Sequence, residues 1–212
     1  MNRWIWCMVF LSFLQIALSA AGPDSEEIIR NVERVLTDQK TVKADFEELF
    51  VWQLVGEKQS IKGEFKLKGD SCFRITTADQ IIVSDGIMLW TYSKPTNRVL
   101  IDKVENAENE WLPQKLFLKT RKEYHHRFVG EGKVSDRKCY IIDFQAIKDD
   151  TYFPKMKVWV DAEKWIPQRI EQTDISKNRV VYTLSDVQTG LALQDSIFQF
   201  KAPVEAEIID LR

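Results

Sequence analysis

The chain has 212 residues, enough for one domain with a sizeable hydrophobic core. Its 30 lysines and arginines nearly balance 32 aspartates and glutamates, and both signs are interspersed along the sequence. A nucleic-acid partner is therefore not indicated, because binding to phosphates calls for a concentrated basic surface.

The first residues have the three-part layout of a secretory signal peptide. A basic start at residues 1–3 precedes an uncharged run from Trp4 to Leu18 and then small residues up to Ala21. The run has 15 residues, whereas a membrane-spanning helix needs roughly 20. We therefore expect cleavage near Ala21, with a signal peptide at 1–21 and the mature domain at 22–212. No cysteine follows the cleavage site, so we expect a soluble protein without a lipid anchor.

The mature chain keeps two cysteines, Cys72 and Cys139. In an oxidising compartment they could form one disulfide, or they could be two separate buried thiols. The sequence leaves both alternatives open.

Residues 25–40 have the apolar spacing of an amphipathic helix, with Glu26 and Glu27 in its first turn, where negative charge suits the helix dipole. Alternation of period two then predicts a long strand from Val42 to Leu54, a turn at 56–58 and a second strand at 61–68. Further strands are predicted at residues 73–75, 81–83, 87–92, 99–101, 125–129, 139–144, 156–160, 166–171, 179–184 and 198–200. The segment 105–119 interrupts this alternation and predicts one or two short helices.

So many consecutive hairpins, without alternation of strand and helix, predict a mainly β fold with a few helices. We expect an unclosed antiparallel β-barrel of about 11 strands whose interior is apolar. Because its own side chains need not fill that interior, we expect an α-helical lid, a ligand or both to occupy it.

Several segments resemble the LolA family, whose members carry outer-membrane lipoproteins. They are residues 42–46, 63–68 with 73–75, 83–86 leading to 89–92, the turn 161–167 and residues 198–203, in the same order and over most of the mature chain. The resemblance implies a half-barrel with a helical lid, and carriage of lipoprotein acyl chains in its cavity within the periplasm. It also implies that cargo comes from an inner-membrane LolCDE-type transporter and passes to an outer-membrane receptor of the LolB type, or directly to the membrane. The chain departs from the family where an arginine usually follows the second long strand, since Gly69 stands there.

An acyl chain offers no hydrogen-bonding groups, so the cavity wall should be broad and apolar. The candidates for contact with acyl chains are Phe46, Phe50, Trp52, Phe65, Leu67, Phe73, Met88, Trp90, Tyr92, Met156, Val158 and Tyr182. The candidates for the lid are Val32, Leu36, Leu116 and Phe117. The alternative for each residue is ordinary core packing.

Enzymatic readings find little support. His125 and His126 are adjacent, so in a strand they point to opposite faces and cannot share a metal ion. The motifs of a nucleophile elbow, a phosphate-binding loop and a Cys-x-x-Cys pair are absent from the sequence. We therefore expect a monomeric carrier, not an enzyme, with no cofactor. The alternatives are a LolA-fold carrier of another lipid or glycolipid, and a periplasmic module that senses lipoproteins.

Overall fold

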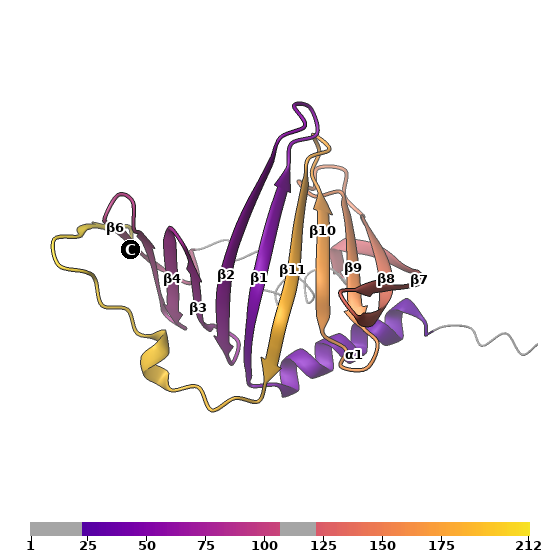
Figure 1. The fold of residues 1–212 in the computed structure, drawn as a ribbon, viewed down its shortest axis with the longest axis horizontal. Coiled ribbons are helices and arrows are strands. Elements are labelled where there is room, and N and C mark those ends of the chain that lie inside the picture. Colours follow the sequence, from indigo (N-terminus) through magenta and orange to yellow (C-terminus); the bar gives the residue numbers. More distant parts are fainter. Residues whose placement is uncertain (1–22, 107–121) are drawn as a thin grey trace, which may run out of the picture.

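A computed structural model describes residues 23–106 and 122–212 (Figure 1). One α-helix, α1 (Ser25–Asp38), and one 3-10 helix, η1 (Asp195–Phe198), accompany the strands in this part of the chain. The strands are β1 (Thr41–Val51), β2 (Lys58–Lys68), β3 (Cys72–Thr77), β4 (Gln80–Asp85), β5 (Met88–Ser93), β6 (Arg98–Lys103), β7 (Tyr124–Val134), β8 (Arg137–Ala146), β9 (Lys155–Asp161), β10 (Pro167–Thr173), β11 (Arg179–Thr189) and β12 (Glu207–Asp210). No helix in the described ranges is both long and apolar enough to cross a membrane.

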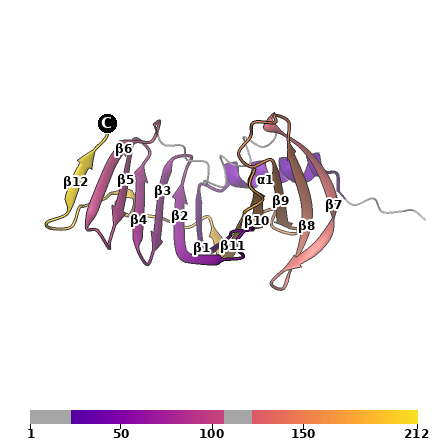
Figure 2. The ribbon, with the colours of Figure 1, turned by 90° about the horizontal axis from the view of Figure 1, so that it is seen from above.

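All the strands form one sheet in the order β12-β6-β5-β4-β3-β2-β1-β11-β10-β9-β8-β7. Seen from above, the two edge strands, β12 and β7, lie at opposite ends of the molecule, so the sheet does not close on itself (Figure 2). Every pairing is antiparallel except that of β12 with β6. The predicted unclosed antiparallel barrel is therefore confirmed.

Two predicted elements need correction, and a third lies outside the described residues. The strand expected at 198–200 is wrong, because Phe198 ends η1 and is buried, and the last strand is β12. The first long strand ends at Val51, since the backbone N–H of Gly56 donates to the carbonyl of Trp52 and turns the chain there. The helices predicted at 105–119 fall almost wholly in 107–121, outside the described residues.

The strand register divides the sheet into two faces. In an antiparallel pair, residues directly opposite each other project to the same side. Phe46 lies opposite Gly63 and Leu184, and Glu48 lies opposite Ile61 and Tyr182. We call this side the inner face and the other side the outer face.

Helix α1 covers the inner face of strands β8–β10. Its fully buried residues Ile28, Ile29 and Val32 pack on strand residues such as Ile142 and Val158. At its start, the Ser25 hydroxyl lies 3.0 Å from Nδ1 of His126, and a Glu26 carboxylate oxygen lies 3.2 Å from Nε2. His125 is exposed. The two histidines therefore point to opposite faces, as predicted.

The segment after β11 covers the outer face of the other half of the sheet, where it runs past β2–β6 (Figure 1). The ring of Phe200 stacks 6.4 Å from that of Trp90 and lies 6.1 Å from that of Tyr92. Phe198 is 2% exposed. Helix α1 thus covers the inner face of one half of the sheet, and the segment after β11 covers the outer face of the other half. Among the described residues, no helix covers the inner face of β1–β4.

The two cysteines are free thiols in this fold, so the disulfide alternative is not realised. Cys72 begins β3 and Cys139 lies in β8, and five strands separate β3 from β8 in the sheet order. Cys139 is buried, and Cys72 is half-buried.

Candidate functional site

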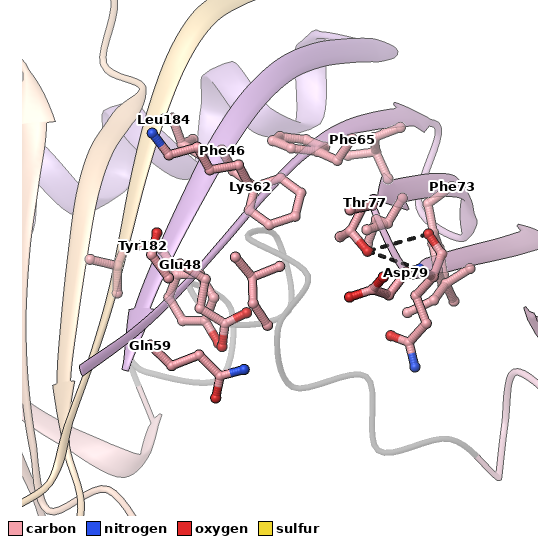
Figure 3. Close-up of a pocket in the computed structure, with 18 of the residues that line it drawn as sticks. Phe46, Glu48, Gln59, Lys62, Phe65, Phe73, Thr77, Asp79, Tyr182 and Leu184 are labelled. Atoms are coloured by element: carbon pink, nitrogen blue, oxygen red, sulfur yellow. Dashed lines mark hydrogen bonds between the residues drawn. The ribbon is translucent and has the colours of Figure 1, made fainter. Parts of the chain in front are cut away.

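The uncovered inner face forms an open cavity of about 670 Å³ (Figure 3). Its wall comes mainly from β1–β4, β10 and β11, strands that are distant in sequence but adjacent in the sheet. The lining residues are Phe46, Glu48, Gln59, Ser60, Ile61, Lys62, Phe65, Leu67, Phe73, Ile75, Thr77, Ala78, Asp79, Gln80, Ile82, Ser93, Pro95, Arg169, Ile170, Gln172, Tyr182 and Leu184.

One part of the wall is apolar and firmly seated. Leu67 and Phe73 are almost fully buried in a cluster with Val42, and the half-buried Phe65 and Ile75 pack against it. The four side chains from β2 and β3 pack against one another on the inner face and line the cavity. Such a wall favours hydrocarbon by excluding water over a broad area.

Gly63 gives this wall part of its depth. A Cβ atom at this position would lie 2.8 Å from Cε1 of Phe46, closer than a real Cβ approaches another atom. The Phe46 ring therefore lies over the β2 backbone in space that any other residue would fill.

The second part of the wall is polar. The Tyr182 hydroxyl donates a hydrogen bond of 3.2 Å to Oε1 of Glu48. Burial raises the pKa of Glu48, although the hydrogen bond from Tyr182 acts in the opposite direction. Burial also raises the pKa of Tyr182, and the nearby Glu48 carboxylate adds to the effect. Glu48 thus has a carboxyl group for which ionisation is costly.

The two cationic residues on the cavity margin direct their charges elsewhere. Nζ of Lys62 lies 3.8 Å from the Glu47 carboxylate, on the outer face. The Arg169 guanidinium lies 4.8 Å from the centre of the Trp159 ring and 3.1 Å from Glu171, also on the outer face. Neither has a contact with Glu48 in the described structure.

Residues 37–201 match the protein family described as outer membrane lipoprotein carrier protein LolA. The chain belongs to the LolA family. Among its relatives is the outer-membrane lipoprotein carrier protein of Francisella tularensis subsp. novicida, 25% identical over 217 residues, which cover 99% of this chain and 98% of that protein. An uncharacterized protein of Methanocaldococcus jannaschii is 23% identical over 209 residues, 95% of this chain. The match spans only 60% of that relative's length.

Solved structures resemble the fold at low sequence identity. An uncharacterized conserved protein from Thermus thermophilus superposes with a TM-score of 0.60 at 12% identity, covering 87% of this chain and 98% of that one. MucB superposes with a TM-score of 0.58 at 13% identity, covering 84% of this chain and 62% of that one. These likenesses show that the half-barrel is shared.

The structure brings together five of the twelve predicted acyl-chain residues. Those that line the cavity are Phe46, Phe65, Leu67, Phe73 and Tyr182. Met156 and Val158 are also on the inner face, but they are buried beneath α1. Met88, Trp90 and Tyr92 project from the outer face of β5, where Phe200 packs on the two larger rings. Phe50 and Trp52 pack on each other at the end of β1, with ring centres 4.3 Å apart, and do not line the cavity.

The prediction from sequence also missed residues of the cavity wall. Ile75, Ile82 and Leu184 line it, as does Glu48. The register of the sheet places the first two there, since Ile75 lies opposite Phe65 and Ile82 lies opposite Ile75. Glu48 occupies an even position in a strand whose even positions are otherwise mostly apolar, which indicated its inward direction, but the prediction of an apolar wall passed over a charged residue.

The predicted lid residues divide between two parts of the LolA-family chain. Val32 and Leu36 belong to the core that α1 forms with β8–β10, on the inner face but beside the cavity. Leu116 and Phe117 lie in 107–121, outside the described residues.

Gly69, at the position of the usual family arginine, is in the tight turn between β2 and β3. Its backbone φ is +63°, a left-handed conformation that glycine adopts without strain. The nearby Arg74 does not substitute for the arginine in the cavity, because its guanidinium lies 3.4 Å from the carbonyl of Ile197 on the outer face.

Proposed function

We propose that this LolA-family protein is a periplasmic carrier that binds the acyl chains of lipoproteins in its inner-face cavity. The observation that carries this proposal is the cavity itself, with an apolar wall built from Phe46, Phe65, Leu67 and Phe73. The family match and the carrier names of its relatives support it. The carrier works by binding and release, without chemical conversion of its cargo.

The size of the cavity suits long hydrocarbon. If a methylene occupies roughly the 30 Å³ share of one water molecule in the liquid, a cavity of about 670 Å³ holds about 20 methylenes. Burying each one contributes about 0.8 kcal/mol. A fully enclosed ligand would therefore be held too firmly to release, and an open cavity lowers the affinity because part of the chain stays in contact with solvent.

The export signal predicted at 1–21 supports a role in the space between two membranes. In this role the carrier receives cargo from an inner-membrane transporter of the LolCDE type. It delivers the cargo to a LolB-type receptor or directly to the outer membrane. Each transfer works by competition, because cargo moves only to a site that binds it more favourably than the cavity does.

Co-purification tests the proposal. The full chain is expressed in a Gram-negative host and recovered from the periplasm, and mass spectrometry identifies the molecules bound to it. We expect acylated lipoproteins on the wild type and much less on Ile75→Trp, which fills part of the cavity. Recovery of a glycolipid alone would show that the protein carries that lipid and not lipoproteins. Absence of any acylated molecule would overturn the proposal.

A further inference from the structure

Glu48 is the only charged residue at an inner-face position of β1–β4, β10 and β11. Following the register across these six strands, every other inner-face residue is apolar or an uncharged polar residue. The acidic neighbour Glu47 points to the outer face, where it accepts a hydrogen bond of 2.7 Å from Ser60 and pairs with Lys62. Asp79, the other carboxylate that lines the cavity, lies in the turn between β3 and β4, so among the inner-face strand residues of the wall Glu48 is the one with a charge.

No cation of the described chain compensates Glu48. Its contact in this structure is the Tyr182 hydroxyl, which donates to Oε1, and no partner is seen for Oε2 among the described residues. Lys62 and Arg169, which border the cavity, are engaged with Glu47 and Glu171 on the outer face. A half-buried carboxylate without a counter-charge is energetically costly, and a ligand that supplies a positive hydrogen-bond donor would remove this cost.

Glu48 also lies at one end of the cavity. Gln59 and Tyr182 lie beside it, and together the three give this end a polar lining (Figure 3). The apolar wall extends away from them along β1 and β2 toward Leu67. Glu48 lies six residues after Val42, the partner of Leu67, and this spacing corresponds to about 20 Å of strand. An amphiphile bound along the strands would thus have its tail at the apolar end and its head at Glu48.

We propose that Glu48 and Tyr182 form a subsite for a primary ammonium group at the head of an acyl-chain ligand. An ammonium has three N–H donors, and the acceptors at this end are Oε2 of Glu48, the Tyr182 oxygen and the side-chain carbonyl of Gln59. Two kinds of molecule carry such a group next to acyl chains. They are a diacylated lipoprotein with a free α-amino group and a phospholipid with an ethanolamine head.

This inference rests on the proposed function, and matched ligands separate the two. A fluorescent fatty-acid probe is bound to the purified protein and displaced by a dipalmitoyl-cysteinyl peptide with a free α-amino group or by the same peptide after N-acetylation. Lysophosphatidylethanolamine and its N-acetylated form make the second pair. Acetylation removes the charge and leaves the acyl chains unchanged, so we expect about tenfold weaker displacement, typical of losing a charge-assisted hydrogen bond.

Two variants assign the effect to Glu48. Glu48→Gln keeps an oxygen that can accept from Tyr182, so circular dichroism should report an unchanged fold, and the free-amine preference should disappear. Glu47→Gln, the outer-face neighbour on the same strand, should keep the preference in full. The ligand pair that shows the larger preference identifies the source of the ammonium.

Equal displacement by the free and acetylated ligands in the wild type would overturn the subsite and leave the carrier function standing. A preference that persists in Glu48→Gln would do the same. Failure of the probe and of every acyl ligand to bind would instead overturn the proposed function.

Discussion

Replacing Ile75 by tryptophan is expected to remove part of the space for acyl chains without affecting the core beneath it. Ile75 is half-buried and lines the cavity, and tryptophan adds about six non-hydrogen atoms to its side chain. If these displace as many of the roughly 20 methylenes that the cavity holds, the loss has an upper limit of about 5 kcal/mol at about 0.8 kcal/mol each. The indole ring itself offers apolar contact, so we expect a smaller effect, about ten- to a hundredfold in affinity.

The effect should depend on ligand size, and displacement of a fluorescent fatty-acid probe measures it. A dipalmitoyl ligand has more methylenes than the cavity holds, so its affinity should fall in Ile75→Trp. An octanoyl ligand needs only part of the space, so its affinity should stay nearly constant. The same change at Ile87, which is 73% exposed in a turn, serves as the control. Equal losses for both ligands, or no loss for either, would refute the reasoning from cavity volume.

Three predictions concern stability and are measured by denaturant unfolding. Asp161 is 3% exposed and accepts hydrogen bonds of 2.9 Å from the backbone N–H groups of Glu163 and Lys164. Burial acts to raise the pKa of Asp161, but these bonds and the Arg137 guanidinium, 3.1 Å from the carboxylate, together outweigh it and lower the pKa. Asp161→Asn should cost about 2 kcal/mol at neutral pH. The difference should begin to shrink as the pH falls below about 4, the ordinary pKa of an aspartate, and should vanish only below the lower folded-state pKa of Asp161, where the wild-type carboxylate becomes protonated. Ile28→Ala should cost about 2–5 kcal/mol, because this residue of α1 is fully buried. Glu48→Gln should stabilise the protein at neutral pH, and the gain should close at low pH. The pKa of Glu48 is raised in the folded protein, so its protonated carboxyl group contributes stability below the unfolded-state pKa. This contribution is lost as the pH rises through the folded-state pKa.

Sequence periodicity predicted most strands well because most of them have one face that is more buried than the other. The positions of α1 and of most hairpins follow from local patterns such as the apolar stripe of Ile28, Ile29 and Val32. The pattern within a strand does not say, however, which of its faces joins the inner face of the next strand. That depends on the register of each hairpin.

Trp90 and Tyr92 illustrate this limit. Both are large aromatic residues in a strand of alternating pattern, as is Phe46, and the sequence grouped them with it. The register through β2, β3 and β4 places Phe46 on the inner face and both β5 residues on the outer face. The cover over Trp90 comes from Phe200, more than a hundred residues away in sequence, which no local pattern indicates.

Photo-crosslinking tests the central claim, that acyl chains occupy the inner face, most directly. A photoreactive phenylalanine analogue is placed at Phe65, on the inner face of β2, or at Leu49, on the outer face of β1. After irradiation with a dipalmitoyl-cysteinyl peptide, mass spectrometry of the digested protein locates the adduct. The account predicts an acyl adduct from position 65 and none from position 49. An adduct from position 49 alone, or equal adducts from both, would contradict it.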